Sequence, residues 1–375
     1  MAVPPERATG PTVGVEEEYL LVDPVSGSPR PIADRVQELA RRDPRLDPHE
    51  VQHELLQAQV EVSTPICSSL PEVAGHLLRL RHALGSAAEQ AGCRLAACAT
   101  STGDLEVAIP VTATARYRAL RTAAPRLVDE QLINGMHVHV AVPERDTGVR
   151  VMNRMRPWLP LLLALSANSP LWLGVDTGFA SWRHLVYSRW PVTGIPPLFR
   201  DAHDYEERVA RLVAGGLIGD PGQLYWAIRL SERYPTVEVR VCDIQLRVDE
   251  AVMLAGLIRA LVMTLQEDAT ADEAGGRMTS EWLQAALWSA ARHGIDDRVP
   301  DPWSGALRKV GDVCSDALDY LSPALEATGD ARHVVPLVHR LLREGNGAVR
   351  QQRVLGEGGW PALRDFLLLQ TSGQG

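Results

Sequence analysis

Three short segments of the chain place acids, histidines or an arginine at every second residue, and this period constrains the fold more than any other feature. They are Gly-Val-Glu-Glu-Glu-Tyr at 14–19, Met-His-Val-His-Val at 136–140 and Val-Glu-Val-Arg-Val at 237–241. Successive residues of a β-strand point to opposite faces of the sheet. Each segment therefore predicts a strand whose ionisable side chains gather on one face.

The residues that share a face are Glu16 and Glu18, His137 and His139, and Glu238 and Arg240. The residues between them in the second and third segments are apolar, as in an antiparallel sheet that packs one face on helices and carries a polar site on the other. Four or more such groups on one sheet face predict divalent metal ions, an anionic and phosphorylated ligand, and hence an enzyme.

The three adjacent carboxylates at 16–18 impose a further condition. On a strand at least one of them must face the sheet interior, which is costly unless a cation compensates its charge. The alternation leaves Glu16 and Glu18 as a pair of hard oxygen ligands suited to Mg²⁺. An exposed edge strand with solvated acids is the alternative.

The stretch from His53 to Thr64 predicts a half-polar strand on which Glu61 lies on the polar face with Gln57 and Gln59. Glu54 would point to the opposite face of a straight strand. It joins the same site only if a bulge or a helical turn intervenes.

Two patterns leave alternatives open. His137 and His139 could bind zinc as an H-x-H pair. Alternatively, one imidazole binds a metal that carboxylates already hold, and the other contacts a ligand. The third alternative is a pair of histidines that are only hydrogen-bonded within the sheet. Glu238 beside Arg240 is either a plain ion pair or an acid for a metal next to a bidentate phosphate ligand.

The composition narrows the class of protein to which the chain can belong. The 375 residues carry a formal charge of −9, which argues against a general nucleic-acid-binding surface. The longest apolar stretch, 158–167, is too short to span a bilayer. The five cysteines show no C-x-x-C pair, so a cytoplasmic, reduced protein without a disulfide framework is expected. P-loop, dinucleotide-binding and G-x-S-x-G motifs are absent from the sequence.

Strands are predicted mainly before residue 245 and helices after Asp249, without βαβ alternation, which favours an α+β fold. One catalytic domain spans 1–375, with a flexible tail at 1–11, a sheet-rich core at 12–245 and a helical part at 246–375. Helix breaks are expected near Gly275, Pro300, Gly329, Gly345 and Gly358. The Gly- and Pro-rich stretch 169–200 is predicted to be irregular and to close over a substrate.

Taken together and in order, these segments resemble the carboxylate–amine ligase family, also called glutamate–cysteine ligase type 2 or YbdK-like. The matching stretches are 12–23, 54–65, 135–140, 165–170 (Leu-Ser-Ala-Asn-Ser-Pro), 176–183, 189–191 (Arg-Trp-Pro), 236–243 and 288–294. Two positions depart from the family pattern: Ala99-Thr100-Ser101-Thr102 replaces Gly-Thr-His-Pro, and Val349 stands where relatives have an acid.

The resemblance implies a fold related to glutamine synthetase: a curved, mainly antiparallel sheet backed by helices. It also implies ATP and Mg²⁺ (with Mn²⁺ as an alternative), small amino-acid substrates and ADP-forming amide synthesis, typically from glutamate and cysteine. No nucleic-acid or membrane partner is expected, and association into a homo-oligomer is left open.

By the same resemblance, the metal and phosphate ligands are Glu16, Glu18, Glu54, Glu61, His137 and Glu238. Arg240 and His139 contact ATP; Glu61, Glu238 and Arg240 serve catalysis; and Arg183 is expected to pair with a substrate carboxylate. The competing hypotheses are a zinc hydrolase on His137 and His139, recruiting His184, His203 or Asp243, and a non-catalytic relative that binds a small molecule.

Overall fold

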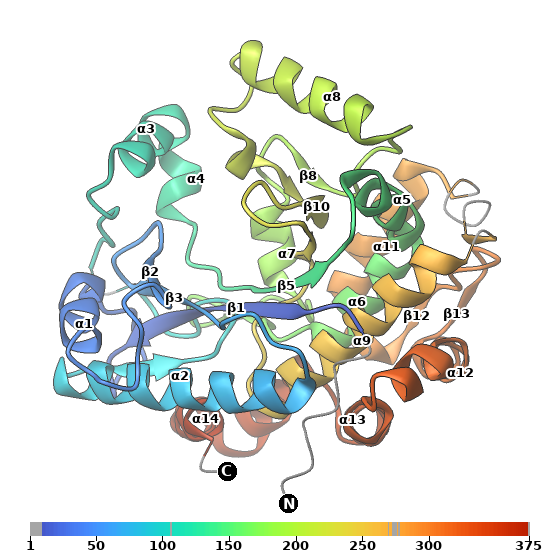
Figure 1. The fold of residues 1–375 in the computed structure, drawn as a ribbon. Coiled ribbons are helices and arrows are strands. Elements are labelled where there is room, and N and C mark those ends of the chain that lie inside the picture. The colour runs from blue at the N-terminus through green and yellow to red at the C-terminus, as the bar shows by residue number, and fades with distance from the viewer. Residues whose placement is uncertain (1–9, 106, 269, 272–275, 277, 374–375) are drawn as a thin grey trace, which may run out of the picture.

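An antiparallel sheet runs through the molecule and carries the predicted polar residues (Figure 1). The computed structural model describes residues 10–105, 107–268, 270–271, 276 and 278–373. Within these residues, seven strands form the sheet in the order β10-β11-β5-β1-β3-β2, and β4 also pairs with β1. The strands are β1 (Val13–Val22), β2 (Val51–His53), β3 (Gln59–Ser63), β4 (Arg94–Ala96), β5 (Met136–Ala141), β10 (Ile228–Leu230) and β11 (Thr236–Val239).

Helices cover one face of this sheet. Figure 1 shows α2 (Leu70–Gln90) and α9 (Val248–Glu267) beneath β1, with α14 (Gly347–Ser372) close to α2. The valines of the three marker strands point to this side and join one core with α2 and α9. Their burial removes apolar surface from water, which is the main stabilising contribution in a domain of this size. The ionisable residues between them are thereby directed to the opposite face.

The other helices and short strands surround this core. The helices are α1 (Ala33–Ala40), α3 (Ala115–Ala123), α4 (Pro125–Asp129), α5 (Arg145–Met155), α6 (Leu159–Ser166), α7 (Trp182–Tyr187), α8 (Ala202–Ala214), α11 (Ser280–His293), α12 (Val310–Ala327) and α13 (Ala331–Glu344). Two-stranded pairs join β6 (Leu171–Trp172) with β7 (Val175–Asp176), β8 (Thr193–Gly194) with β9 (Tyr225–Trp226), and β12 (Arg298–Pro300) with β13 (Leu307–Lys309). In Figure 1, α3 and α8 rise on either side of the open sheet face.

The α+β prediction, with its antiparallel sheet and helical carboxyl-terminal third, is confirmed. The α2 amino terminus is capped, because the Ser69 hydroxyl accepts a hydrogen bond from the Glu72 amide. Gly92 ends the same helix with φ +81°. The amino-terminal tail falls largely on 1–9, and the break near Gly275 also lies outside the described residues.

Two local predictions are wrong. The stretch 53–64 is not one strand, because β2 and β3 form an antiparallel hairpin that turns between His53 and Gln59. The stretch 169–200, expected to be irregular, contains α7 and three short strands.

Candidate active site

Strand register brings the marker segments together on one face of the sheet. Glu16 on β1 lies opposite His137 on β5, and Glu18 lies opposite Glu61 on β3. Residues directly opposite each other on neighbouring strands share a face. We call the resulting cluster the acidic face; it comprises Glu16, Glu18, Glu54, Glu61, His137, His139, Glu238 and Arg240.

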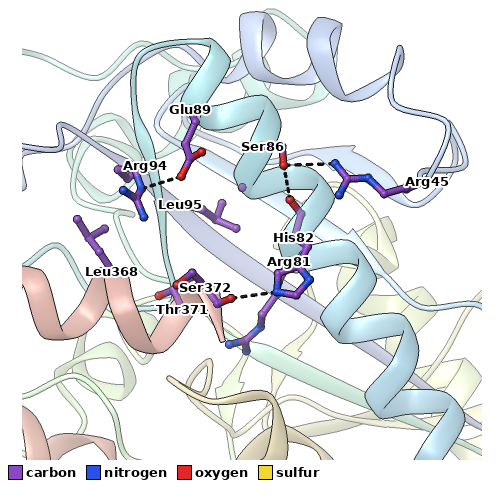
Figure 2. Close-up of a pocket in the computed structure, with 11 residues that line it drawn as sticks. Arg45, Arg81, His82, Ser86, Glu89, Arg94, Leu95, Leu368, Thr371 and Ser372 are labelled. Carbon is purple, nitrogen blue, oxygen red and sulfur yellow. Dashed lines mark hydrogen bonds and ion pairs between the residues drawn. The ribbon is translucent and has the colours of Figure 1, made fainter. Parts of the chain in front are cut away.

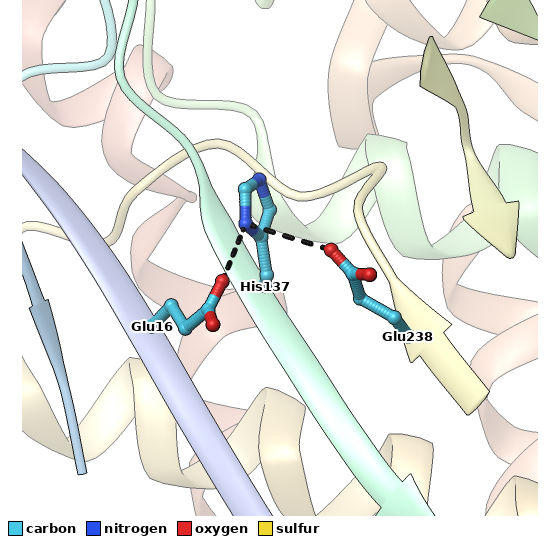
Figure 3. Close-up of side chains that lie close together, drawn as sticks. All are labelled: Glu16, His137 and Glu238. Atoms are coloured by element: carbon cyan, nitrogen blue, oxygen red, sulfur yellow. Dashed lines mark hydrogen bonds and ion pairs between the residues drawn. The ribbon is translucent and has the colours of Figure 1, made fainter. Parts of the chain in front are cut away.

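The centre of the acidic face is formed by Glu16, His137 and Glu238 (Figure 3). The His137 Nδ1 atom lies 3.0 Å from Glu16 Oε2 and 4.0 Å from Glu238 Oε1. One ligand atom from each of the three residues lies within 4.8 Å of the other two. Two carboxylates and an imidazole at this spacing are a donor set that a divalent cation accepts.

A second group of acids lies beside this centre. The raised pKa of Glu54, about 7, reflects burial and the neighbouring charge of Glu18. Burial and the charges of Glu16, Glu54 and Glu18 raise the pKa of Glu61 well above its usual range. Glu54 reaches the cluster because it follows β2 in the hairpin turn, so the condition that a turn intervenes is met.

Positive groups counter the charge of the central acids. Burial alone would raise the pKa of Glu16, but hydrogen bonds with His137 and His139 hold it well below its usual range. Burial likewise opposes ionisation of Glu238, yet the charges of Arg240 and Arg229 keep its pKa far below normal. Both acids are therefore carboxylates near neutral pH.

The acidic face fits a divalent cation by a further observation. The buried Nε2 atom of His137 has no hydrogen-bond partner among the described residues, and the buried Nε2 atom of His139 lies 3.4 Å from Glu16 Oε1. For Glu54 and Glu61, burial and the neighbouring acids raise the pKa by more than the charges of nearby arginines lower it. Carboxylates that repel one another beside a buried imidazole nitrogen without a partner are satisfied when a metal ion binds.

This electrostatic imbalance predicts the pH dependence of stability. The folded pKa of Glu54 is about 7, against 4.5 for an ordinary glutamic acid. Between these values the folded protein binds a proton that the unfolded chain has lost, so the free energy of unfolding falls as pH rises. We expect metal-free protein to lose at most about 3 kcal/mol between pH 4.5 and 7.5.

Because metal binding needs the ionised carboxylate, Mg²⁺ should restore more stability at pH 8 than at pH 5.5. Urea unfolding with either Mg²⁺ or a chelator, at both pH values, measures this difference. The Glu54→Gln variant is the control, since its amide does not titrate. An identical pH slope in that variant would contradict the assignment to Glu54.

Arg240 is held at the edge of the same cluster. Its guanidinium donates to Glu238, and its Nε donates to the Tyr187 hydroxyl at 3.3 Å. Arg229 on β10 lies opposite Glu238 and donates to it from Nε at 2.7 Å. Glu238 thus joins two arginines, and one of them lies 3.4 Å from His137 Nδ1.

We expect Arg240→Lys to slow turnover by about 10- to 100-fold, because a single ammonium cannot reproduce the planar fork that binds a phosphate in two places. Steady-state ADP release at saturating ATP measures the effect. Tyr187→Phe is the comparison, since it removes one acceptor of Arg240 but leaves Glu238 to orient the guanidinium, and its effect should be smaller than that of Arg240→Lys. An unchanged rate in Arg240→Lys would remove the arginine from the site.

Glu17 is the acid that faces the sheet interior, and Arg81 on α2 is the cation that compensates it. Glu17 is fully buried and accepts a hydrogen bond from Arg81 Nε at 3.0 Å. Tyr19 donates its hydroxyl to the same carboxylate. This ion pair fixes the orientation of β1, because turning the strand over would bury Glu16 and Glu18 without a counter-charge.

The remaining candidates lie apart from the acidic face. Arg183 on α7 is 3% exposed, lies 5.2 Å from the Tyr187 ring centre and donates weakly to the backbone carbonyl of Arg240. Asp243 accepts hydrogen bonds from Ser169 and Ser181.

The zinc alternative would need His184, His203 or Asp243 to join the two strand histidines. In the described part of the chain, none of these three belongs to the group that could hold a metal. His203 is exposed on α8, and burial with the charge of Arg183 lowers the pKa of His184 to about 4. The zinc-hydrolase hypothesis is therefore not favoured.

Two residues of the site, Arg229 and Tyr187, are not among those predicted from the sequence. Arg229 was detectable in principle, because Ile-Arg-Leu at 228–230 is a polar residue between apolar ones on a strand. Tyr187 carries no comparable signal, since it ends a short helix inside a stretch with no clear period.

Comparison with known proteins agrees with this geometry. A model of glutamate-cysteine ligase family 2 matches residues 12–363. This chain belongs to that family. The protein is therefore an ATP-dependent ligase of the glutamate–cysteine ligase type.

Relatives from several bacteria match over nearly their full length. A Mycolicibacterium vanbaalenii protein, provisionally named glutamate–cysteine ligase 2-2, is 43% identical over 92% of this chain and 93% of its own. A Rhodopirellula baltica protein, provisionally named glutamate–cysteine ligase 2, is 40% identical over 92% and 93%.

Among solved structures, glutamate–cysteine ligase of Francisella tularensis in complex with AMP is similar with a TM-score of 0.71 and 13% identity. The match covers 97% of this chain and 89% of that chain. A bifunctional glutathione synthetase from Pasteurella multocida gives a TM-score of 0.67 at 15% identity, over 98% and 53%. At these identities the likeness shows a shared fold.

None of the described helices is both long and apolar enough to cross a membrane.

Proposed function

We propose that the protein joins the carboxylate of glutamate to L-cysteine or a related amine, with ADP and phosphate as the other products. The observation that supports this is the acidic face, where acids, imidazoles and a fixed arginine from four neighbouring strands and a hairpin turn converge. Membership of the family adds the reaction type. The identity of the two substrates is the part that experiment must test.

The chemistry needs the γ-phosphoryl group of ATP to be transferred to a carboxylate, which is otherwise a poor acyl donor. A carboxylate oxygen attacks the γ-phosphorus, the bond to the β,γ-bridging oxygen breaks, and ADP leaves. The amine then attacks the carbonyl carbon of the acyl phosphate, inorganic phosphate leaves, and the amine proton passes to solvent. The reaction therefore requires that the acidic face bind a triphosphate and neutralise its charge.

The residues proposed to hold Mg²⁺ are Glu16, Glu18, Glu54, Glu61, His137 and Glu238. Bound Mg²⁺ would neutralise negative charge on the triphosphate oxygens. Arg240, already oriented by Glu238 and Tyr187, is proposed to donate to the phosphates, with His139 beside it. Because the orientation exists before ATP binds, little ordering is needed at the moment of reaction.

No protein nucleophile is required, and the cysteines agree with this. All five are buried. Burial raises the pKa of the Cys98, Cys242 and Cys314 thiols to about 12, so they remain protonated near neutral pH. Activation of the carboxylate by ATP takes the place of covalent catalysis.

Arg183 is proposed to bind a substrate carboxylate. Its Nε is buried without a hydrogen-bond partner in the described residues, and its guanidinium stacks on Tyr187, whose hydroxyl accepts from Arg240. If this is correct, Arg183→Lys should raise KM for glutamate more than KM for ATP.

The decisive experiment is ADP release from ATP and Mg²⁺, screened over pairs of amino acids and amines with mass detection of the product. We expect ADP and amide only when a carboxylate and an amine are both present. Absence of ADP release with every pair that is tested would instead favour the non-catalytic relative that binds a small molecule.

The route is tested with glutamate labelled with ¹⁸O in its carboxylate. Through an acyl phosphate, one labelled oxygen passes to inorganic phosphate. Through an acyl adenylate, the label would appear in AMP. Label in AMP would disprove the phosphorylated intermediate while leaving the ligase assignment in place.

A further inference from the structure

A pocket of about 330 Å³ lies on the side of β1 opposite the acidic face (Figure 2). It is formed between α2, β4 and the end of α14. Its lining residues are Arg45, Arg81, His82, Gly85, Ser86, Glu89, Arg94, Leu95, Leu368, Thr371 and Ser372. Pockets of a few hundred Å³ are the usual size for small-molecule ligands. Nothing in the proposed ligase reaction uses this pocket.

The lining is predominantly basic. Arg45, Arg81 and Arg94 contribute three guanidinium groups, and Glu89 is the acid among the lining residues. The hydroxyls of Ser86, Thr371 and Ser372 also line the pocket, and each donates to a backbone carbonyl of its own helix. In a protein whose net charge is −9, three arginines around one concavity stand out. Arginine forks of this kind bind phosphate and carboxylate oxygens in pairs.

Arg81 forms a rigid wall of the pocket. It is 3% exposed and is fixed by Glu17, by the Gln245 carbonyl at 2.9 Å and by the Leu246 carbonyl at 2.8 Å. Its donors are therefore satisfied and its charge is compensated by Glu17, so Arg45 and Arg94 are the arginines that could bind a ligand directly.

The other two arginines are held only by surface ion pairs. Arg94 lies 3.4 Å from Glu89, with side-chain exposures of 36% and 59%. Arg45 pairs with Asp43 and donates to the Ser86 hydroxyl at 3.3 Å. An exposed pair such as Arg94 with Glu89 contributes about 0–1 kcal/mol, so Arg94 can exchange its partner for a ligand at little cost. Arg45 is held more firmly, because its Nε and Nη2 both donate to Asp43, whose side chain is 13% exposed.

We propose that this pocket is a second ligand site, for a small anion with two or more negative charges, carried by phosphate or carboxylate groups. The site shares strand β1 with the acidic face but opens on the opposite side of the sheet. The proposed site does not depend on the identity of the ligase substrates, because it follows only from the pocket, its arginines and its hydroxyls.

Substitution of a glycine in the pocket by a larger residue tests the proposal directly, because the new side chain fills the pocket. Gly85 lies in the middle of α2, lines the pocket, and a Cβ atom built there meets nothing within 4 Å. Gly85→Leu should fill the space and, because leucine is a better helix former than glycine, leave the fold at least as stable. Gly75→Leu is the matched control: Gly75 lies on the same helix in open space but does not line the pocket.

A second pair of variants tests the charge. Arg45→Ala/Arg94→Ala removes two exposed arginines from the pocket. Arg35→Ala/Arg42→Ala removes the same charge from α1 and the residues after it, where both arginines pair with Glu38. All four variants should unfold cooperatively with melting temperatures near that of the parent protein.

The experiment is calorimetric titration of metal-free protein with inorganic pyrophosphate and, separately, with citrate, at an ionic strength fixed by sodium chloride. We expect at least one anion to lose tenfold or more affinity in Gly85→Leu and in Arg45→Ala/Arg94→Ala, and to bind both controls as it binds the parent. If only the affinity for pyrophosphate decreases, the ligand is a phosphorylated molecule. If only the affinity for citrate decreases, the ligand is a polycarboxylate. Unchanged affinity for both anions in both pocket variants would overturn the proposal, whatever the outcome of the ADP assay.

Discussion

Glu16→Gln is expected to reduce turnover by at least about 100-fold, whereas Glu17→Gln at the next residue should leave turnover per folded molecule within about threefold. Glu16 belongs to the three-residue group that could hold a metal, and Glu17 is paired with Arg81 on the other face of the same strand. Loss of residues that merely support metal ligands costs 10- to 100-fold, so loss of a ligand should cost more.

The two variants should also differ in stability, in the opposite order. Glu17→Gln leaves Arg81 buried without a counter-charge, which is expected to lower the free energy of unfolding by about 3 kcal/mol. Glu16→Gln loses the carboxylate that contacts His137 but also removes one of the acids that raise the pKa of Glu61, so we expect a smaller loss of stability than in Glu17→Gln. ADP release and urea unfolding, measured on the same preparations, separate the two effects. Equal losses of turnover in both variants would show that the acidic face is wrongly assigned.

Glu238→Gln is expected to abolish measurable ADP formation, with a decrease of about 1000-fold or more. The substitution removes a proposed metal ligand and the acceptor that orients Arg240, so two parts of the proposed phosphate-binding site fail together. It also leaves Arg229 and Arg240 with only an amide between them. We still expect a folded protein at 25 °C, because the amide oxygen accepts one of the hydrogen bonds.

Asp330→Asn is the matched control for the cost of breaking a buried ion pair. Asp330 accepts from Arg259 Nε at 2.9 Å, and both side chains are buried in the helical part of the chain. Its loss should lower stability as much as Glu238→Gln while preserving turnover. Restoration of normal rates in Glu238→Gln at high Mg²⁺ would contradict its role in orienting Arg240, and normal rates at all Mg²⁺ concentrations would exclude both roles.

The sequence identified the residues of the acidic face through a local property. Side chains alternate across a strand because of backbone geometry alone, so Glu16 must share a face with Glu18, and His137 with His139, wherever the strands lie. The requirement that one of the three adjacent acids meets a buried cation follows from the cost of an unpaired charge, and Glu17 with Arg81 confirms it. The family resemblance was likewise readable from ordered motifs.

The order of the strands was not readable, because it depends on pairings between residues that are far apart in the sequence, from tens of positions to more than a hundred. Only the register shows that Glu16 faces His137 and that Glu18 faces Glu61. The hairpin turn that brings Glu54 beside Glu18 was mistaken for a continuous strand, since the polar alternation of 57–63 does not reveal where the chain reverses.

Sequence alone therefore determined which side chains act together on each strand, as a consequence of the two-residue period. The tertiary structure decided which strands lie next to one another, that Arg229 and Tyr187 support Glu238 and Arg240, and that Arg81 lines a basic pocket behind β1. These contacts are set by long-range packing of helices against the sheet, for which no local pattern in the chain encodes the partner.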